Sequence, residues 1–157
     1  MAVTMTKIID GKAFADNLCE TLKDEITQLK TDHSLEPSIA VVLVGDDPAS
    51  HVYVRNKVKR CAQLGIRSVE HRLDSITSQV ELLSLIDSLN EDSSIHGILV
   101  QLPLPKQINS KVVLEAISPA KDVDGFHPMN VGNLSSGYES SVPCTPLGCY
   151  LLIKKIE

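Results

Sequence analysis

The chain has 157 residues, 43% of them hydrophobic and 22% charged, and these values fit one globular domain better than a disordered segment. Its net charge of −5 argues against nonspecific nucleic-acid binding, which requires a basic face that neutralises phosphates. No apolar stretch of the sequence is long enough to predict a membrane span.

The cysteines and the first residues bear on the cellular compartment. The four cysteines form neither the C-x-x-C pairs of zinc sites nor the framework of a small secreted domain, so reduced thiols are expected. Residues 1–7 lack the uninterrupted apolar segment of a signal peptide. Together these features predict a cytoplasmic protein.

The first part of the chain alternates between helical and strand patterns. Apolar residues at steps of three and four predict an amphipathic helix over residues 12–32. The continuous apolar run 39–44 predicts a strand that is buried on both faces, as in a parallel sheet. The helical spacing returns over residues 49–64, where Gly65 is a suitable C-cap, and a weaker strand is expected at 66–73.

The same order is then repeated. Residues 78–90 have helical spacing, and residues 95–102 form another apolar run that predicts a buried strand. The apolar stripe expected on this helix consists of Val80, Leu83, Ile86 and Leu89. Strands that alternate with helices predict an α/β fold with three layers, α/β/α, around a mostly parallel sheet.

The last third of the chain is less regular. A short helix is expected over residues 109–117, and a helix over 147–156 follows Pro146. Between them, residues 119–146 are rich in Gly, Pro, Asn and Ser and show little periodicity. Loops of this length in compact domains are usually functional or disordered, and function is favoured here. The apolar anchors expected in this loop are Val123, Phe126, Val131 and Leu134.

The turn Gly45–Ser50 connects a predicted strand to a helix, the position at which α/β folds hold ligands. It has neither of the glycine spacings of phosphate loops, so a simple turn with a helix cap is the alternative. Ser50, Tyr53 and Lys57 are spaced at i, i+3 and i+7 and therefore share one helix face. An aromatic ring beside an amine on that face indicates a candidate binding site.

A cluster of positive charge occupies the same predicted helix. Residues 55–60 contain four cations, Arg55, Lys57, Lys59 and Arg60. Such a cluster is most often a solvated helix face. It can also make one region attractive to an anionic small molecule.

Two further segments carry polar residues at the ends of apolar runs. Gln101 ends the strand 95–102, either as a cap of the sheet or as part of a site. Asp122 and Asp124 lie close to His127, but Phe126 and Pro128 interrupt the order of a calcium loop, and no metal is expected. An aspartate before glycine is also common in turns, where it bonds the backbone.

Cys144 lies between Pro143 and Pro146, at the expected entry to the last helix. A thiol at a helix N-terminus can be reactive. Because no histidine is designated as its partner, a rigid, proline-flanked helix entry is the preferred interpretation.

Four segments, taken in order, resemble the signature blocks of the methylenetetrahydrofolate dehydrogenase/cyclohydrolase (FolD) family. They are residues 44–50 with Tyr53 and Lys57, residues 97–105, residues 121–128 and residues 143–146. The resemblance runs from near residue 7 to the end of the chain, and four blocks in the same order are far more specific than one motif. It implies the N-terminal catalytic domain of such an enzyme, with the fold of amino-acid-dehydrogenase-like N-terminal domains.

The resemblance also implies a reaction. Members of the family oxidise 5,10-methylenetetrahydrofolate to the 5,10-methenyl cation with NADP, or with NAD in some cases, and hydrolyse that cation to 10-formyltetrahydrofolate. These steps make the family an oxidoreductase and a hydrolase of one-carbon metabolism, which supplies purine, methionine and histidine biosynthesis.

The roles of individual residues follow from the same resemblance. Lys57 matches the catalytic amine, Gln101 matches the glutamine that holds it, and Ser50 is expected to assist near it. Tyr53 matches the tyrosine that stacks against the folate. Asp124 matches the carboxylate that pairs with the amino-pyrimidine edge of the pterin. The expected substrate-binding set is Tyr53, Asp124, Val100, Leu102 and Pro103.

One part of the family pattern has no match. Family members continue into a Rossmann domain with a phosphate-binding turn, which this sequence does not contain, so dehydrogenase activity is not expected from this chain alone. Residues 1–146 are interpreted as the folate-binding domain and 147–157 as the start of a linking helix. Family members are homodimers, and a weaker dimer or a monomer is expected here.

Two alternatives to the enzyme remain at this point. One is a folate-binding fragment without turnover. The other is the substrate domain of an amino-acid or shikimate-type dehydrogenase, which the run Gln101–Pro105 disfavours.

Overall fold

The computed structural model describes residues 8–155, so the segment 1–7, judged above for a signal peptide, lies outside the described residues. The elements in chain order are α1 (Gly11–His33), β1 (Ser38–Val44), α2 (Pro48–Leu64), β2 (Arg67–Leu73), α3 (Gln79–Glu91), β3 (Gly97–Val100), α4 (Ser110–Ala116), α5 (Pro128–Ser135) and α6 (Cys144–Lys154). The predicted alternation of helices and strands is confirmed. None of the described helices is long and apolar enough to cross a membrane.

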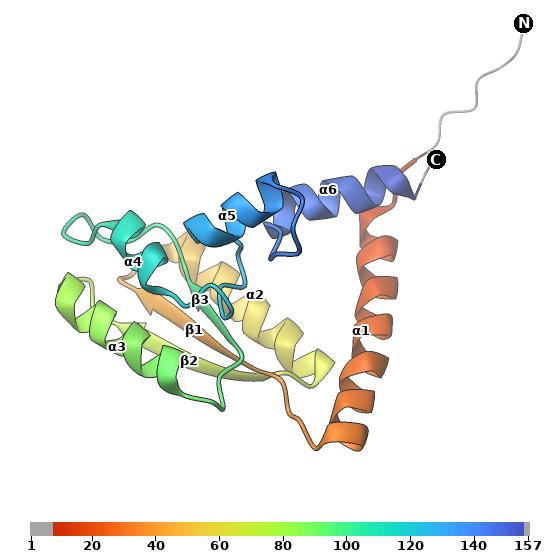
Figure 1. Cartoon of the computed structure of the whole chain (residues 1–157), viewed down its shortest axis with the longest axis horizontal. Coiled ribbons are helices and arrows are strands. Elements are labelled where there is room, and N and C mark those ends of the chain that lie inside the picture. The colour runs from red at the N-terminus through yellow and green to blue at the C-terminus, as the bar shows by residue number, and fades with distance from the viewer. Residues whose placement is uncertain (1–7, 156–157) are drawn as a thin grey trace, which may run out of the picture.

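The three strands form a parallel sheet in the order β2-β1-β3, with β1 in the centre (Figure 1). Val42 of β1 is in register with His71 of β2 on one side and with Val100 of β3 on the other. Parallel strands bring their carboxyl ends to the same edge of a sheet, where α/β folds place their ligand sites. The turn after β1 and Gln101 after β3 therefore meet at one edge.

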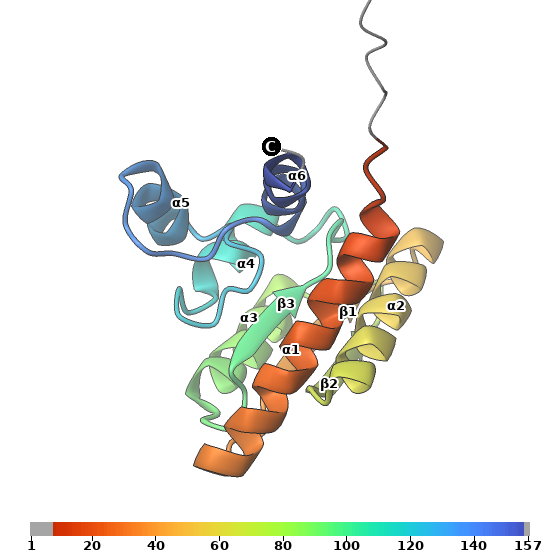
Figure 2. The ribbon, with the colours of Figure 1, turned by 90° about the vertical axis from the view of Figure 1, so that its right-hand side faces the viewer.

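Both faces of β1 are buried, as its continuous apolar run predicts. Ala40, Val42 and Val44 pack against α3 and α4, whereas Val41 and Leu43 pack against α2. Helix α1 lies beside α2 on the latter side of the sheet, and α3 lies on the opposite side (Figure 2). The result is the predicted three-layer α/β/α arrangement.

Local sequence signals set the ends of these helices. The Asp47 carboxylate accepts a hydrogen bond from the backbone N–H of Ser50 and caps α2, which ends at Gly65 in a left-handed conformation with φ of 81°. Ser78 and Glu81 form a reciprocal capping box at the start of α3. The Asp47 cap therefore fixes the start of α2, the helix that carries Tyr53 and Lys57.

The region from residue 119 onward differs most from the prediction. Helix α5 lies within the predicted loop 119–146, and α6 begins at Cys144, three residues before the expected start at Leu147. The α5 sequence contains Pro128, Gly132 and two asparagines, which weaken a helical pattern, but Pro128 occupies the first turn, where proline is tolerated.

Several predictions of which apolar residues are buried are also wrong. Phe126, Val131 and Leu134 are exposed rather than anchored, and only Val123 packs against the core. On α3, Val80 is exposed, and Leu82 takes its place in the core beside Ile86 and Leu89. Helix α1 buries only Ile26 of its predicted stripe, because it packs mainly on α2 at the outside of the molecule.

Glycine at position 97 allows the segment after α4 to run close beside β3. The backbone N–H of Ile98 donates to the carbonyl of Lys121 at 2.7 Å, and Ile98 pairs with Asp122 in an isolated parallel bridge. A Cβ added at Gly97 would collide with the side chain of Val123. The close approach sets the position of the residues that follow Val123.

We predict that Gly97→Ala lowers the free energy of unfolding by about 1–3 kcal/mol, the usual cost of forcing an extra carbon into a packed site. Gly132→Ala is the matched control, because residue 132 lies in a helix and a Cβ added there meets nothing within 4 Å. The control is expected to be neutral or to stabilise by up to about 1 kcal/mol. Urea unfolding of both variants measures the difference, and equal stability of the two would contradict the prediction.

Candidate active site

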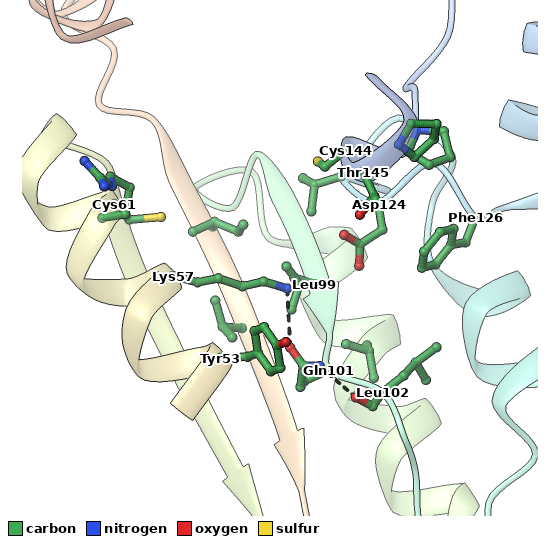
Figure 3. Close-up of a pocket in the computed structure, with 17 residues that line it drawn as sticks. Tyr53, Lys57, Cys61, Leu99, Gln101, Leu102, Asp124, Phe126, Cys144 and Thr145 are labelled. Carbon is green, nitrogen blue, oxygen red and sulfur yellow. Dashed lines mark hydrogen bonds between the residues drawn. The ribbon is translucent and has the colours of Figure 1, made fainter. Parts of the chain in front are cut away.

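A cleft of about 760 Å³ opens between α2, the end of β3, the segment around Asp124 and the start of α6 (Figure 3). Its polar or charged lining residues are Tyr53, Lys57, Arg60, Gln101, Asp124 and Thr145. Most of the remaining wall is apolar, with residues such as Ile39, Val41 and Leu99. Apolar walls with a few convergent polar groups are typical of small-molecule sites.

An amine held by an amide lies in the cleft. The Lys57 Nζ donates a hydrogen bond to Gln101 Oε1 at 3.3 Å, and the Gln101 Nε2 donates in turn to the carbonyl of Leu102 at 2.7 Å (Figure 3). The second bond leaves Gln101 Oε1 as the atom that faces the lysine. The sequence places these residues 44 positions apart, and the end of the parallel sheet brings them together.

Asp124 points into the cleft from the side opposite α2 (Figure 3). Partial burial raises the pKa of its carboxyl above the ordinary value of 3.8, the positive charge of Lys57 partly offsets that rise, and the negative charge of Asp122 adds to it. Within residues 8–155 its carboxylate accepts no hydrogen bond, so its acceptor sites face the cleft.

Asp122 has the opposite environment. It is only 3% exposed, and its carboxylate accepts hydrogen bonds from the backbone N–H groups of Gly125 and His127 and from the Asn130 amide, at 3.0, 2.8 and 3.0 Å. An aspartate in a turn often bonds to the backbone, and this was the alternative role considered for Asp124, which precedes Gly125. In the structure Asp122 makes these backbone bonds instead. Asp124 is left free of structural bonds among the described residues.

Gly125 makes this turn possible. Its φ of 67° lies in the left-handed region, and a Cβ there would lie 2.7 Å from the carbonyl oxygen of Ser141. Asp122, Asp124 and Gly125 thus form one unit in which the first residue anchors, the second faces the cleft and the third permits the close approach.

Two predicted site residues do not reach the cleft. Ser50 is buried, and its hydroxyl donates to the Asp47 carboxylate at 2.8 Å, so it belongs to the cap of α2. Pro103 is exposed and follows Leu102 through a cis peptide bond, and it does not line the cleft. Tyr53, Val100 and Leu102 do line it, together with Lys57, Gln101 and Asp124.

Other lining residues were not singled out as site residues by the sequence. Arg60 and Cys61 lie one turn beyond Lys57 on α2, and continuing the i, i+4 and i+7 series from Tyr53 would have found Arg60. Cys144 and Thr145 also line the cleft. They lie in the first turn of α6, which was expected from the sequence to begin only at Leu147. Phe126 also lines it, and this explains in part why an apolar residue of that segment is exposed.

Residues 8–155 contain no group of three His, Cys, Asp or Glu side chains that could hold a metal ion. The cleft instead combines one amine, one carboxylate of raised pKa and one amide, a set suited to proton transfer and to binding a polar heterocycle.

Comparisons with known proteins identify relatives of this chain. A family model described as tetrahydrofolate dehydrogenase/cyclohydrolase, catalytic domain, matches residues 9–124. A bifunctional protein FolD of Cereibacter sphaeroides is 57% identical over 148 residues, which are 94% of this chain and 50% of that protein. The chain spans about half the length of the curated relatives it matches.

Solved structures show the same relation. The bifunctional FolD methylenetetrahydrofolate dehydrogenase/cyclohydrolase of Campylobacter jejuni is 49% identical with a TM-score of 0.93, over 96% of this chain and 53% of that one. The FolD enzyme of Trypanosoma brucei, complexed with NADP cofactor and inhibitor, is 32% identical with a TM-score of 0.91, over 97% of this chain and 52% of that one.

The raised pKa of Asp124 predicts a stability effect with a defined sign. The folded state binds a proton at Asp124 more tightly than the unfolded state, so this residue's contribution is most favourable below pH 3.8 and is lost as the pH rises through the folded pKa. We therefore expect Asp124→Asn to melt at the same or a higher temperature than the wild type at pH 7, with a smaller difference near pH 4. Thermal melts between pH 4 and 7 measure this.

Asp122→Asn is the matched control, because it makes the same change two residues away. An amide at this position turns an N–H donor toward backbone and Asn130 donors, and we expect a loss of about 1–3 kcal/mol of unfolding free energy. A larger loss of stability for Asp124→Asn than for Asp122→Asn would reverse the assignment of the two carboxylates.

Proposed function

The chain belongs to the tetrahydrofolate dehydrogenase/cyclohydrolase family, and from this premise we propose that it supplies the folate site and the catalytic lysine for one-carbon interconversion. The reactions are the oxidation of 5,10-methylenetetrahydrofolate to the 5,10-methenyl cation and the hydrolysis of that cation to 10-formyltetrahydrofolate. The observation that carries the proposal is the cleft in which Lys57, bonded to Gln101, lies across from Asp124.

Lys57 is the proton-transfer group of the proposed hydrolysis. With Lys57 as the unprotonated amine, water attacks the methenyl carbon and gives a proton to Nζ. The bond from that carbon to N5 then breaks, N5 takes a proton back from the ammonium, and the remaining proton of water is released. Gln101 serves this step by holding Nζ at a defined position through its Oε1.

Asp124 is the proposed partner of the pterin. The amino-pyrimidine edge of a reduced pterin presents a ring N–H and an exocyclic amino group side by side, and an ionised carboxylate accepts from both. The free acceptor atoms and partial burial of Asp124 support this role, because such a pairing offsets the cost of desolvating the charge. Its negative charge also favours a cationic substrate.

Tyr53 and the apolar walls are proposed to hold the flat parts of the substrate. Tyr53 is 62% exposed and lines the cleft, so it is accessible for stacking. An aromatic face also attracts the methenyl cation. Val100 and Leu102 complete the wall near Gln101, whereas the roles first expected of Ser50 and Pro103 are not part of this proposal.

The dehydrogenase step needs a hydride acceptor, and NADP is the proposed one for the whole protein. The 157 residues contain no G-x-G-x-x-G segment, so the part that this chain's residues play in the proposed reaction is to hold the folate and not the dinucleotide. Residues 1–146 are proposed as the folate domain and 147–157 as the start of a linking helix, although Cys144–Pro146 of α6 also line the cleft.

The wider setting is part of the same proposal. We infer a cytoplasmic homodimeric enzyme, an oxidoreductase and a hydrolase, whose formyl and methenyl folates serve purine, methionine and histidine biosynthesis. Neither nucleic acid nor membrane is a proposed partner.

We predict that Lys57→Met abolishes cyclohydrolase turnover and leaves folate affinity within about tenfold, because the amine transfers protons more than it anchors the ligand. Loss of methenyltetrahydrofolate absorbance above the buffer rate measures turnover, and titration measures affinity. Lys59→Met, an exposed lysine of the same helix, is the control and should keep full activity. Unchanged turnover in Lys57→Met, or wild-type protein that binds folate without turnover, would contradict the catalytic proposal.

We predict that Asp124→Asn weakens folate binding by roughly 2–4 kcal/mol, because one acceptor is replaced by a donor that faces a donor of the pterin. Asp122→Asn should weaken binding less, since its side chain makes no contact in the cleft and acts on Asp124 only through the turn, to which the amide oxygen can still accept one of the hydrogen bonds. Titration with a folate analogue, alongside melting temperatures, separates the two effects. Equal binding losses in the two variants would remove Asp124 from the proposed pterin site.

A further inference from the structure

Helix α5 contributes one residue to the interior of the protein, and that residue is polar. Asn130 is 6% exposed and is the only buried residue of the helix. Its apolar neighbours Met129 and Val131 are 60% and 50% exposed. Burial of apolar surface therefore contributes little to the placement of α5, and the Asn130 amide is its buried attachment to the fold.

The Asn130 amide has a hydrogen-bond partner for each of its polar atoms. Its Nδ2 donates to Asp122 Oδ2 at 3.0 Å and to the backbone carbonyl of Pro119 at 2.9 Å. The Ser140 hydroxyl donates to oxygens of Asn130, at 3.0 Å from the backbone carbonyl and 3.2 Å from Oδ1. The two acceptors beside Nδ2 and the donor beside Oδ1 together fix the orientation of the amide.

Asp122 connects this amide to the cleft. Asp122 Oδ2, which accepts from Asn130, also accepts from the backbone N–H of His127, and Oδ1 accepts from the backbone N–H of Gly125. These bonds close a turn that contains Asp124. Since the Asp124 carboxylate accepts no hydrogen bond within residues 8–155, the conformation of the turn sets its direction into the cleft (Figure 3).

Loss of the Asn130 amide would leave the buried Asp122 carboxylate with one donor fewer. A carboxylate in that state gains free energy from any shift that brings water or another donor to it. Such a shift moves the turn and the Asp124 carboxylate, whose hydrogen bonds to two adjacent donors of a pterin weaken steeply with poor angles. Lys57 and Gln101 lie on α2 and at the end of β3, and their hydrogen bond to each other does not involve this turn.

We propose that Asn130 is a positioning residue of the folate site and acts on the substrate through Asp122 and Asp124. Asn130 does not line the cleft, so it is not a catalytic residue. This inference rests on the proposed function. Because Asn130 controls how the pterin is held while Lys57 transfers the proton, loss of the amide raises KM and leaves kcat nearly unchanged.

The test uses the full-length protein and measures KM and kcat for hydrolysis of methenyltetrahydrofolate, together with the Kd of a folate analogue. Asn130→Ala should raise KM and Kd roughly three- to tenfold and keep kcat within about twofold of the wild type. Asn133→Ala is the matched control, because this residue lies one turn further along α5 and its side chain makes no hydrogen bond among the described residues. The control should leave KM, kcat and Kd unchanged.

A double-mutant cycle separates positioning from general destabilisation. Asp124→Asn removes the group through which Asn130 acts, so adding Asn130→Ala in that background should weaken binding by less than about twofold. A residue with a merely structural role would cause the same fold-loss in both backgrounds.

Ser140→Ala provides a second cycle if Asn130→Ala melts below the assay temperature. It removes the hydroxyl that orients the amide and leaves the amide in place. It should weaken binding roughly two- to threefold in the wild-type background and not in Asp124→Asn.

Equal fold-losses in the two backgrounds, an unchanged KM in Asn130→Ala, or a fall in kcat as large as the rise in KM overturns the role of Asn130 while the folate site stands. Equal losses in Asn133→Ala and Asn130→Ala overturn it too, because a general effect on α5 then suffices. If Asp124→Asn binds as tightly as the wild type, or the wild type binds no folate, the proposed function fails together with this inference.

Discussion

The candidate site depends on the buried carboxylate of Asp122. Two backbone N–H groups and one side-chain amide donate to it, and this fixes the turn in which Asp124 faces the cleft. A buried carboxylate is costly unless its donors stay in place, so these three hydrogen bonds favour this conformation of a turn that has no regular secondary structure. Gly97 and Gly125 remove the two side chains that would prevent this turn from approaching β3 and residue 141.

The fold was largely predictable, because β1 and its neighbours carry patterns that only one layer arrangement satisfies. A run of apolar residues without alternation, flanked by amphipathic helices, has to be buried on both faces of a parallel sheet. Helix α5 was not predictable in the same way, because it buries only Asn130 and so leaves no apolar stripe in the sequence. Helix α3 shows a related limit of prediction from periodicity. Its spacing indicated that Val80 is buried, but the buried residue is Leu82, two positions further along the helix.

Helical spacing accounts for one part of the site, and only the family resemblance indicates the rest. Lys57, Tyr53 and Arg60 share a face of one helix, and helical spacing alone groups them. The pairing of Lys57 with Gln101 and the opposition of Asp124 depend on strand order and on the turn, which no local pattern encodes. Ser50 shows that spacing alone does not place a side chain in the cleft, because it lies on the lysine's helix while its hydroxyl bonds to the Asp47 cap of α2.

The Asp124 carboxylate is placed in the cleft at some cost to the free protein, and this separates it from the structural carboxylate of Asp122. Asp122 is paired with three donors of the fold, whereas Asp124 is partly desolvated with its pKa raised and accepts no hydrogen bond among the described residues. Groups that the fold itself leaves poorly satisfied are those that a ligand can satisfy, because the gain from pairing them appears only in the complex. In this cleft that group is the Asp124 carboxylate, and the amine of Lys57 lies across from it, so a complementary molecule presents hydrogen-bond donors close to its reacting centre.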